Sequence, residues 1–255
     1  SEPLRRCLEL IVEHDAPDAI VVLGTCPVEV IGDQFDRVVD AVSEETGVPM
    51  VALHTSGLKL SSQQDMLDWC FDTLAGLHTE SETETRAERV ALIGMPSSTA
   101  GTAELRTLLA SSAVELLASF PDGARLQDWK QLASCKRILV SDKAMFPKLM
   151  RRLETSGCAI EEAPLPYGFE QTMTVHEHLL GVAGMRIDDA SLEVREKAEQ
   201  AVSQFKSRWA GTPMALTIRM HNSNQVNMVA RGGLGHVRLF MELGLDVTLL
   251  IQGSP

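Results

Sequence analysis

AIVVLGTCPVEVIGD, from Ala19 to Asp33, carries the strongest fold signal in the chain. Its first five residues, Ala19 to Leu23, form a short apolar run rich in Ile and Val, which is typical of a buried parallel strand. Gly24 to Pro27 interrupt this run, and helical spacing of apolar residues begins at Asp33. Cys26 therefore lies in a turn at the carboxyl end of a strand, where open α/β sheets tend to bind ligands.

The alternation of an apolar strand with an amphipathic helix continues along the whole chain. This pattern predicts an α/β fold of Rossmann-like parallel sheets flanked by helices, with right-handed crossovers between neighbouring strands. It predicts two βαβ units and the start of a third. Strands are expected over residues 19–23, 49–54, 89–94, 114–120, 137–142, 159–164, 214–220 and 246–251, and helices over residues 4–13, 33–45, 61–77, 102–110, 126–133, 144–154, 172–182, 191–209 and 235–243.

A polar, charged segment, Thr79 to Glu88 (TESETETRAE), is the strongest candidate for a linker between domains. We therefore predict a first Rossmann-like unit over residues 1–80, which carries Cys26, and a second over residues 89–190. Residues 191–255 are predicted to hold a connecting helix and the start of a third, truncated unit. Because the last predicted strand runs directly into the end of the sequence, we expect these 255 residues to be a fragment of a longer chain.

Composition narrows the classes of protein that the sequence fits. The net charge is −12, from 23 Lys and Arg against 35 Asp and Glu, which argues against nucleic acid and anionic membrane surfaces as partners. No apolar stretch approaches the length of about 18 residues that a membrane span requires. The five cysteines are scattered and form no CxxC pair, so we expect a reduced, cytoplasmic protein without a self-contained zinc or iron–sulfur site.

The position of Cys26 is compatible with three roles. Spacing alone favours a buried structural thiol, because cysteine is among the most often buried residues. A nucleophile would need a histidine base, and His54 at the carboxyl end of the next predicted strand could supply one. A thiolate in this turn could also bind iron, but a cluster takes about four ligands, so the others would have to come from elsewhere.

Four segments together resemble one known family, the nitrogenase component 1-type oxidoreductases. The stretch around Cys26 resembles the family's cluster-cysteine motif, in which a cysteine is followed by a small insert and then by Ile-Gly-Asp-Asp, with Gln34 here in place of the second acid. The strand and His-Thr loop that follow resemble most closely the β-type subunit. In chain order the segments are GTCPVEVIGDQF (24–35), VPMVALHTSGL (48–58), APLPYGFEQT (163–172) and GHVRLFMELGLDVTLLIQGSP (235–255).

The resemblance covers nearly the whole chain and implies a set of partners and cofactors. The family includes nitrogenase, scaffolds for assembly of its cofactor, and dark-operative protochlorophyllide and chlorophyllide reductases. Its members have three Rossmann-like domains, and paired subunits share an iron–sulfur cluster at their interface. An ATP-dependent, homodimeric iron protein delivers the electrons.

By motif match, Cys26 corresponds to the third cluster cysteine of the family. Where cofactor-bearing subunits end a strand with a cysteine, this chain has Ser141 and Asp142, which agrees with a β-like identity. The resemblance implies a fragment that helps bind the shared cluster of a multi-electron reductase or an assembly scaffold, and that holds no cluster and is inactive by itself. The alternative is a Rossmann-like domain that binds a small anionic ligand at its strand ends, with Cys26 structural.

Overall fold

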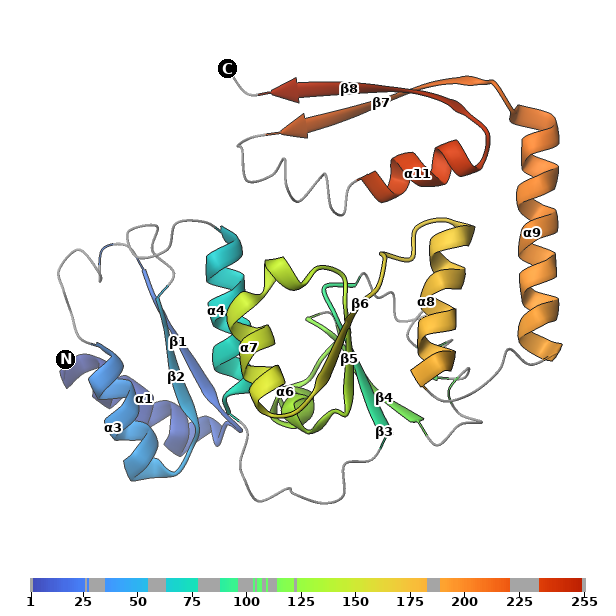
Figure 1. Ribbon diagram of the computed structural model, residues 1–255. Helices are drawn as coiled ribbons and strands as arrows, with labels where there is room; N and C mark the ends of the chain where they lie inside the picture. The colour runs from blue at the N-terminus through green and yellow to red at the C-terminus, as the bar shows by residue number, and fades with distance from the viewer. Residues whose placement is uncertain are drawn as a thin grey trace. The chain divides into compact units, whose positions relative to one another are not determined.

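The computed structural model confirms the predicted alternation of helices and strands (Figure 1). It describes residues 2–25, 27, 35–54, 63–77, 88–95, 103, 105–106, 109, 114–121, 123–182, 189–220 and 234–253. All strand pairs in these residues are parallel, as predicted. By contact clustering the chain divides into unit 1, Ser1–Glu80 with Ala144–Arg152, and unit 2, Ser81–Lys143 with Leu153–Pro255.

The observed bounds of the elements are as follows. The strands are β1 (Ile20–Gly24), β2 (Met50–His54), β3 (Glu88–Ile93), β4 (Val114–Phe120), β5 (Arg137–Val140), β6 (Ala159–Glu162), β7 (Pro213–Met220) and β8 (Asp246–Gly253). The helices are α1 (Glu2–Asp15), α3 (Phe35–Thr46), α4 (Gln63–Ala75), α6 (Leu126–Gln131), α7 (Pro147–Thr155), α8 (Phe169–Val182), α9 (Asp189–Trp209) and α11 (Leu234–Glu242), with short 3₁₀ turns at Leu132–Ser134 and Lys143–Met145.

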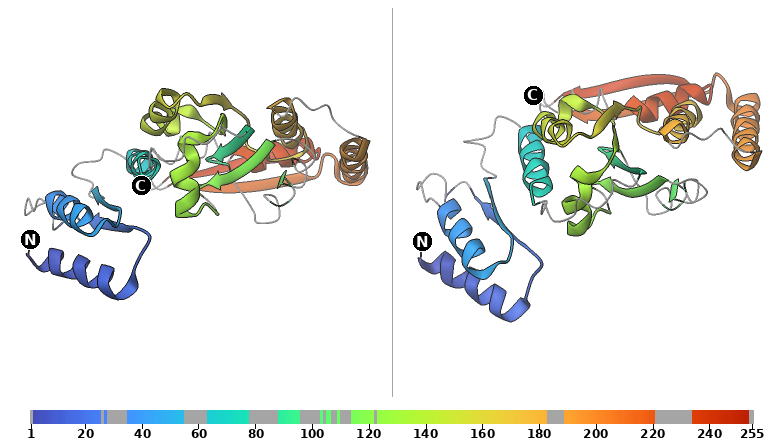
Figure 2. Two further views of the ribbon diagram at one scale, coloured as in Figure 1. Left: turned by 90° about the horizontal axis from the view of Figure 1, so that it is seen from below. Right: turned by 60° about the horizontal axis from the view of Figure 1, so that its bottom comes forward.

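Unit 1 is built on the two-stranded parallel sheet of β1 and β2, whose register runs from Ile20 opposite Met50 to Gly24 opposite His54. Helices α1 and α3 cover one face of this sheet (Figure 2). Their apolar stripes meet the strands in one cluster because the stripes recur at helical spacing. The buried members of this cluster are Leu8, Phe35, Val39, Val42 and Met50.

Helix α4 contacts β2 and also fixes the start of α7 within unit 1. Asp68 on α4 is 2% exposed, and its carboxylate accepts hydrogen bonds from the backbone N–H groups of Lys148 and Leu149 at 2.9–3.1 Å. These N–H groups lie in the first turn of α7 and have no partner inside the helix. Asp68 thus satisfies backbone donors that the helix itself leaves open.

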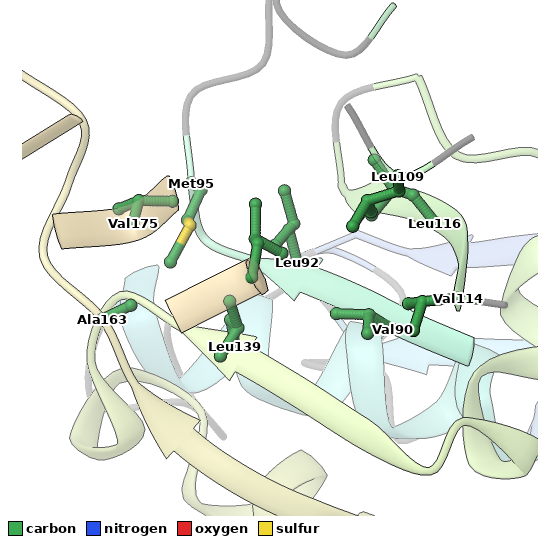
Figure 3. Close-up of a cluster of buried hydrophobic side chains, with 10 residues drawn as sticks. Val90, Leu92, Met95, Leu109, Val114, Leu116, Leu139, Ala163 and Val175 are labelled. Carbon is green, nitrogen blue, oxygen red and sulfur yellow. The ribbon is translucent and has the colours of Figure 1, made fainter. Parts of the chain in front are cut away.

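Unit 2 contains a four-stranded parallel sheet in the order β4-β3-β5-β6. One of its faces packs against α8 in an apolar cluster (Figure 3). Phe120 at the end of β4 packs edge-on against Trp129 of α6, with ring centroids 4.7 Å apart. Residues 90–93 of the central strand β3 and residues 138–140 of the central strand β5 are buried, which explains why these strands are nearly continuous apolar runs.

Unit 2 also contains the parallel pair β7–β8 and helix α11, which contacts β8. Glu242 at the end of α11 accepts hydrogen bonds from the backbone N–H groups of Phe169 and Glu170, at 3.0 and 3.3 Å. Gly168, which precedes them, has a φ of +83°, and an added Cβ there would collide with the Glu242 carboxylate. A glycine is therefore required at this position.

The predicted elements agree with the structure to within a few residues at their ends. Strand β5 ends at Val140 rather than at residue 142, and α8 begins at Phe169 rather than at residue 172. The predicted helix over 102–110 and the linker over 79–88 fall mostly outside the described residues. The division into domains at residues 80, 89 and 191 stays a prediction. Among the described helices, none combines the length and the apolar character that crossing a membrane would demand.

Candidate functional site

The carboxyl ends of β1 and β2 form the candidate site of unit 1. Gly24 and His54, the last residues of these strands, are register partners across the sheet. Neighbouring strands of a sheet lie about 4.8 Å apart, so these two residues are close neighbours. Cys26, the predicted cluster ligand, follows Gly24 by two residues and lies outside the described residues.

The end of β1 requires a glycine because an aromatic ring lies directly against it. Phe35, the first residue of α3, is 2% exposed. An added Cβ on Gly24 would come within 2.6 Å of Cε1 of the Phe35 ring, a distance that real Cβ atoms essentially never show. The chain therefore leaves β1, toward Cys26, at a position where the Gly24 backbone and the Phe35 ring are in close contact.

His54 is paired with an acid from α3. Its Nε2 lies 2.8 Å from Oδ1 and 3.0 Å from Oδ2 of Asp36, and the hydrogen-bond geometry assigns the bond to Oδ2. The His54 side chain is 15% exposed and that of Asp36 is 48% exposed. A neutral histidine would donate its Nε2 proton to this carboxylate, and a protonated one would form an ion pair with it.

Two aromatic rings hold the His54 imidazole. The Phe35 ring centroid lies 4.8 Å from it, and that of Trp69, on α4, lies 5.7 Å from it, both in tilted arrangements. Ring contacts at these distances favour one orientation of the imidazole. The sequence pointed to His54 as a possible base but missed its neighbours Phe35, Asp36 and Trp69, whose only sequence signal is that they start or lie in the helices that follow β1 and β2.

Three of the four described cysteines are poor candidates for metal ligands. Cys135 and Cys158 are buried in unit 2, and burial raises the pKa of the Cys135 thiol to about 12. Burial also raises the pKa of Cys70 on α4, while Cys7 lies exposed on α1. Because the thiolate is the metal ligand, buried thiols with a raised pKa bind metals poorly. Within the described part of the chain, no three His, Cys, Asp or Glu side chains come together as a metal site.

The site also bears on the alternative of a small anionic ligand. The charged side chain that pairs with His54 is an acid, Asp36, in the first turn of α3. A carboxylate at this position would repel an anion, so this alternative is not favoured. Ser141 directly follows β5 of the four-stranded sheet, and its backbone N–H donates a hydrogen bond to the carbonyl of Ile93 at 3.1 Å.

Comparisons with known proteins agree on one family. The family model for nitrogenase component 1 type oxidoreductases matches residues 1–251. The chain is 26% identical over 267 residues to the nitrogenase iron-molybdenum cofactor biosynthesis protein NifE of Rhodobacter capsulatus, covering 96% of this chain and 51% of that protein. It is 24% identical to the nitrogenase molybdenum-iron protein alpha chain of Acidithiobacillus ferridurans, covering 89% of this chain and 46% of that protein.

Solved structures show the same fold. Nitrogenase Cp1 at pH 6.5 matches with a TM-score of 0.73 and 18% identity, covering 98% of this chain and 48% of that one. The chain thus spans about half the length of the relatives it matches. The relatives named here include an alpha chain, and the likeness of the His54-Thr55 loop to the β-type subunit stays a prediction.

Proposed function

The chain belongs to the nitrogenase component 1 type oxidoreductase family, and on that premise we propose that it helps to bind an iron–sulfur cluster at the interface between two paired subunits. Cys26 supplies one thiolate to this cluster. The observation that supports this role is the tight strand end at Gly24 and Phe35, which precedes Cys26 by two residues in the chain. Residues 1–80 would form the unit that carries this ligand.

The remaining cluster ligands come from elsewhere in the assembly. Clusters of this kind are held by about four cysteines, and the four described cysteines of this chain are buried, carry a raised pKa or lie exposed on α1. A paired component 1-type subunit would supply the missing thiolates at the shared interface. An ATP-dependent, homodimeric iron protein would deliver electrons to the cluster, in the cytoplasm.

When bound, the cluster would accept and pass on single electrons. The residues of this chain would set its surroundings. Gly24 and the Phe35 ring are buried against each other at the end of β1, and His54 offers a polar, hydrogen-bonded group at the end of β2. Burial and hydrogen bonding near the sulfur atoms are the features that tune the potential of such clusters. The parent protein is then a multi-electron reductase or a scaffold for cofactor assembly.

The test is substitution of the proposed ligand in the full-length protein together with its paired subunit. Cys26→Ser should lower the iron and acid-labile sulfide bound after anaerobic reconstitution by at least about tenfold. Loss of a direct ligand should weaken metal binding at least as much as loss of a residue that only supports a ligand. Cys7→Ser is the matched control, since Cys7 lies exposed on α1, and should leave the iron content unchanged. An unchanged iron content and visible spectrum in Cys26→Ser would overturn the proposal.

A further inference from the structure

The turn between β6 and α8 receives a side chain from a distant part of unit 2. Glu242, the last residue of α11, is 73 positions along the chain from Phe169, the first residue of α8. Its carboxylate accepts hydrogen bonds from the backbone N–H groups of Phe169 and Glu170. These groups have no partner within the helix, so the carboxylate takes the place of an outside anion at the start of α8.

A glycine lets the backbone of α11 approach this turn closely. An added Cβ on Gly168 would lie 3.6 Å from the Cα of Leu239, besides its collision with the Glu242 carboxylate. Leu239 and Glu242 are three positions apart on α11 and therefore lie on one face of the helix. This face of α11 thus meets the turn through both a backbone atom and a charged side chain.

Arg238 adds a second polar contact from the same helix. The Gln171 side chain fits its neighbours in one amide orientation, in which it donates to the carbonyl of Leu165 and accepts from the Arg238 guanidinium. Arg238 and Glu242 are four positions apart, so their side chains are neighbours on the helix surface. Both ends of the segment 165–171 are therefore connected to α11.

The contact joins two layers of unit 2 that share no strand pairing. In the residues that the structure describes, β7 and β8 form a sheet of their own, and no strand of β4-β3-β5-β6 is hydrogen-bonded to them. Helix α11 contacts β8, whereas α8 packs on the four-stranded sheet. Because hydrogen bonds to an ionised group are roughly twice as strong as neutral ones, Glu242 is well suited to hold these layers together.

A second carboxylate of unit 2 provides the contrast. Glu162, the last residue of β6, accepts a hydrogen bond from the backbone N–H of Lys143 at 2.8 Å. Lys143 lies in the 3₁₀ turn that follows β5, and β5 already pairs with β6. The bond of Glu162 therefore ties together elements that the sheet itself joins, unlike the bonds of Glu242.

We propose that Glu242 is a conformational latch: its bonds to the first turn of α8 hold the layer of β7, α11 and β8 against α8, so that the two sheets of unit 2 keep one arrangement. Residues 191–255, which the sequence predicts as a connecting helix and a further unit, then do not move independently of the second unit. The inference concerns neither Cys26 nor a cluster, and it stands or falls separately from the proposed function.

The experiment is hydrogen–deuterium exchange of the full-length protein, resolved to single residues by mass spectrometry. Glu242→Ala should speed the exchange of the Phe169 and Glu170 amides at least about tenfold, because each loses a hydrogen bond to a charged group. The latch also predicts exchange at least about threefold faster throughout α11, since this helix opens more easily once it is released. Glu242→Gln keeps one acceptor oxygen and should show smaller increases at both places.

Two further variants separate a latch from a simple helix cap. Gly168→Ala displaces the Glu242 carboxylate from the other side of the contact and should also speed exchange in α11. The double variant with Glu242→Ala should change α11 no more than the larger single effect, because both substitutions break one contact. Glu162→Gln is the matched control and should speed exchange at Lys143 while leaving α11 unchanged.

Two outcomes would overturn the latch. If Glu242→Ala speeds exchange at Phe169 and Glu170 but leaves α11 unchanged, Glu242 only caps α8. If Glu162→Gln speeds exchange in α11 as much as Glu242→Ala does, the effect is a general loosening of unit 2 and not the release of one contact.

Discussion

The sheet of β1 and β2 in unit 1 and the sheet that contains β5 in unit 2 are both built from parallel strands rich in Ile, Leu and Val. Their burial differs. In β1, Val21 and Leu23 are 42% and 59% exposed, whereas Leu139 in β5 is 0% exposed. The strand next to the candidate site is thus apolar on a face that the described residues of its own unit leave open, while β5 is packed on both faces.

An apolar strand sequence therefore does not by itself show how far the side chains of that strand are buried. Strand β5 has neighbours on both sides, β3 and β6, whereas β1 pairs with β2 alone among the described strands. Helices α1 and α3 cover the face of β1 that holds Ile20 and Val22. The polar and aromatic groups at the carboxyl end of β1 therefore lie beside a strand that the described residues cover on one face, whereas β5 in the core of unit 2 is covered on both faces.

The largest difference between the two regions should appear in thiol chemistry. Cys135, just before β5, has a pKa raised to about 12 by burial, so its thiolate fraction near pH 8 falls by about a thousandfold relative to an ordinary cysteine. Cys7 on α1 lies exposed. Iodoacetamide at pH 8 should therefore alkylate Cys135 at least about a hundredfold more slowly than Cys7. Rates within tenfold of each other in the folded chain would contradict this, and in urea the two rates should converge.

The next largest effect concerns the core of unit 2. Leu139→Ala removes a fully buried side chain from β5 and should lower the free energy of unfolding by about 3 kcal/mol, from lost burial and the cavity that remains. Urea unfolding followed by tryptophan fluorescence measures this change. A loss below about 1 kcal/mol would show that the sheet closes the cavity, and the contrast between the two sheets would then be weaker than burial suggests.

A smaller effect is expected at the end of β1. Gly24→Ala places a Cβ against the Phe35 ring and should cost about 1–2 kcal/mol, because the ring or the strand must shift. Gly181→Ala on α8 is the matched control, since an added Cβ there meets no atom within 4 Å. It should raise stability by about 0.5 kcal/mol through better helix propensity. If Gly24→Ala were equally favourable, the strand end would not be tightly packed.

The sequence predicts the order of elements well because several strands, such as β1, β3 and β4, are short apolar runs that end at or next to a glycine or a proline, and the helices repeat apolar residues at helical spacing. It does not predict that β3 lies between β4 and β5, because a right-handed crossover can place the next strand on either side of its predecessor. The bond between His54 and Asp36 also has no local signal, since it depends on where α3 packs against β2. Spacing alone favours a structural thiol at Cys26, and the interpretation as a cluster ligand becomes the preferred one only when distant segments are considered together with it.

The smallest effect should come from the exposed face of β1, where the same substitution as in β5 can be made. Leu23→Ala removes the same atoms as Leu139→Ala, but from a side chain that is 59% exposed, so it should cost less than about 1 kcal/mol. Both variants replace Leu by Ala in a β-strand, so the ratio of the two losses in unfolding free energy measures the effect of burial alone. Equal costs, measured by the same urea unfolding, would mean that Leu23 is covered in solution, and the contrast between the two sheets would fail at the strand that leads to Cys26.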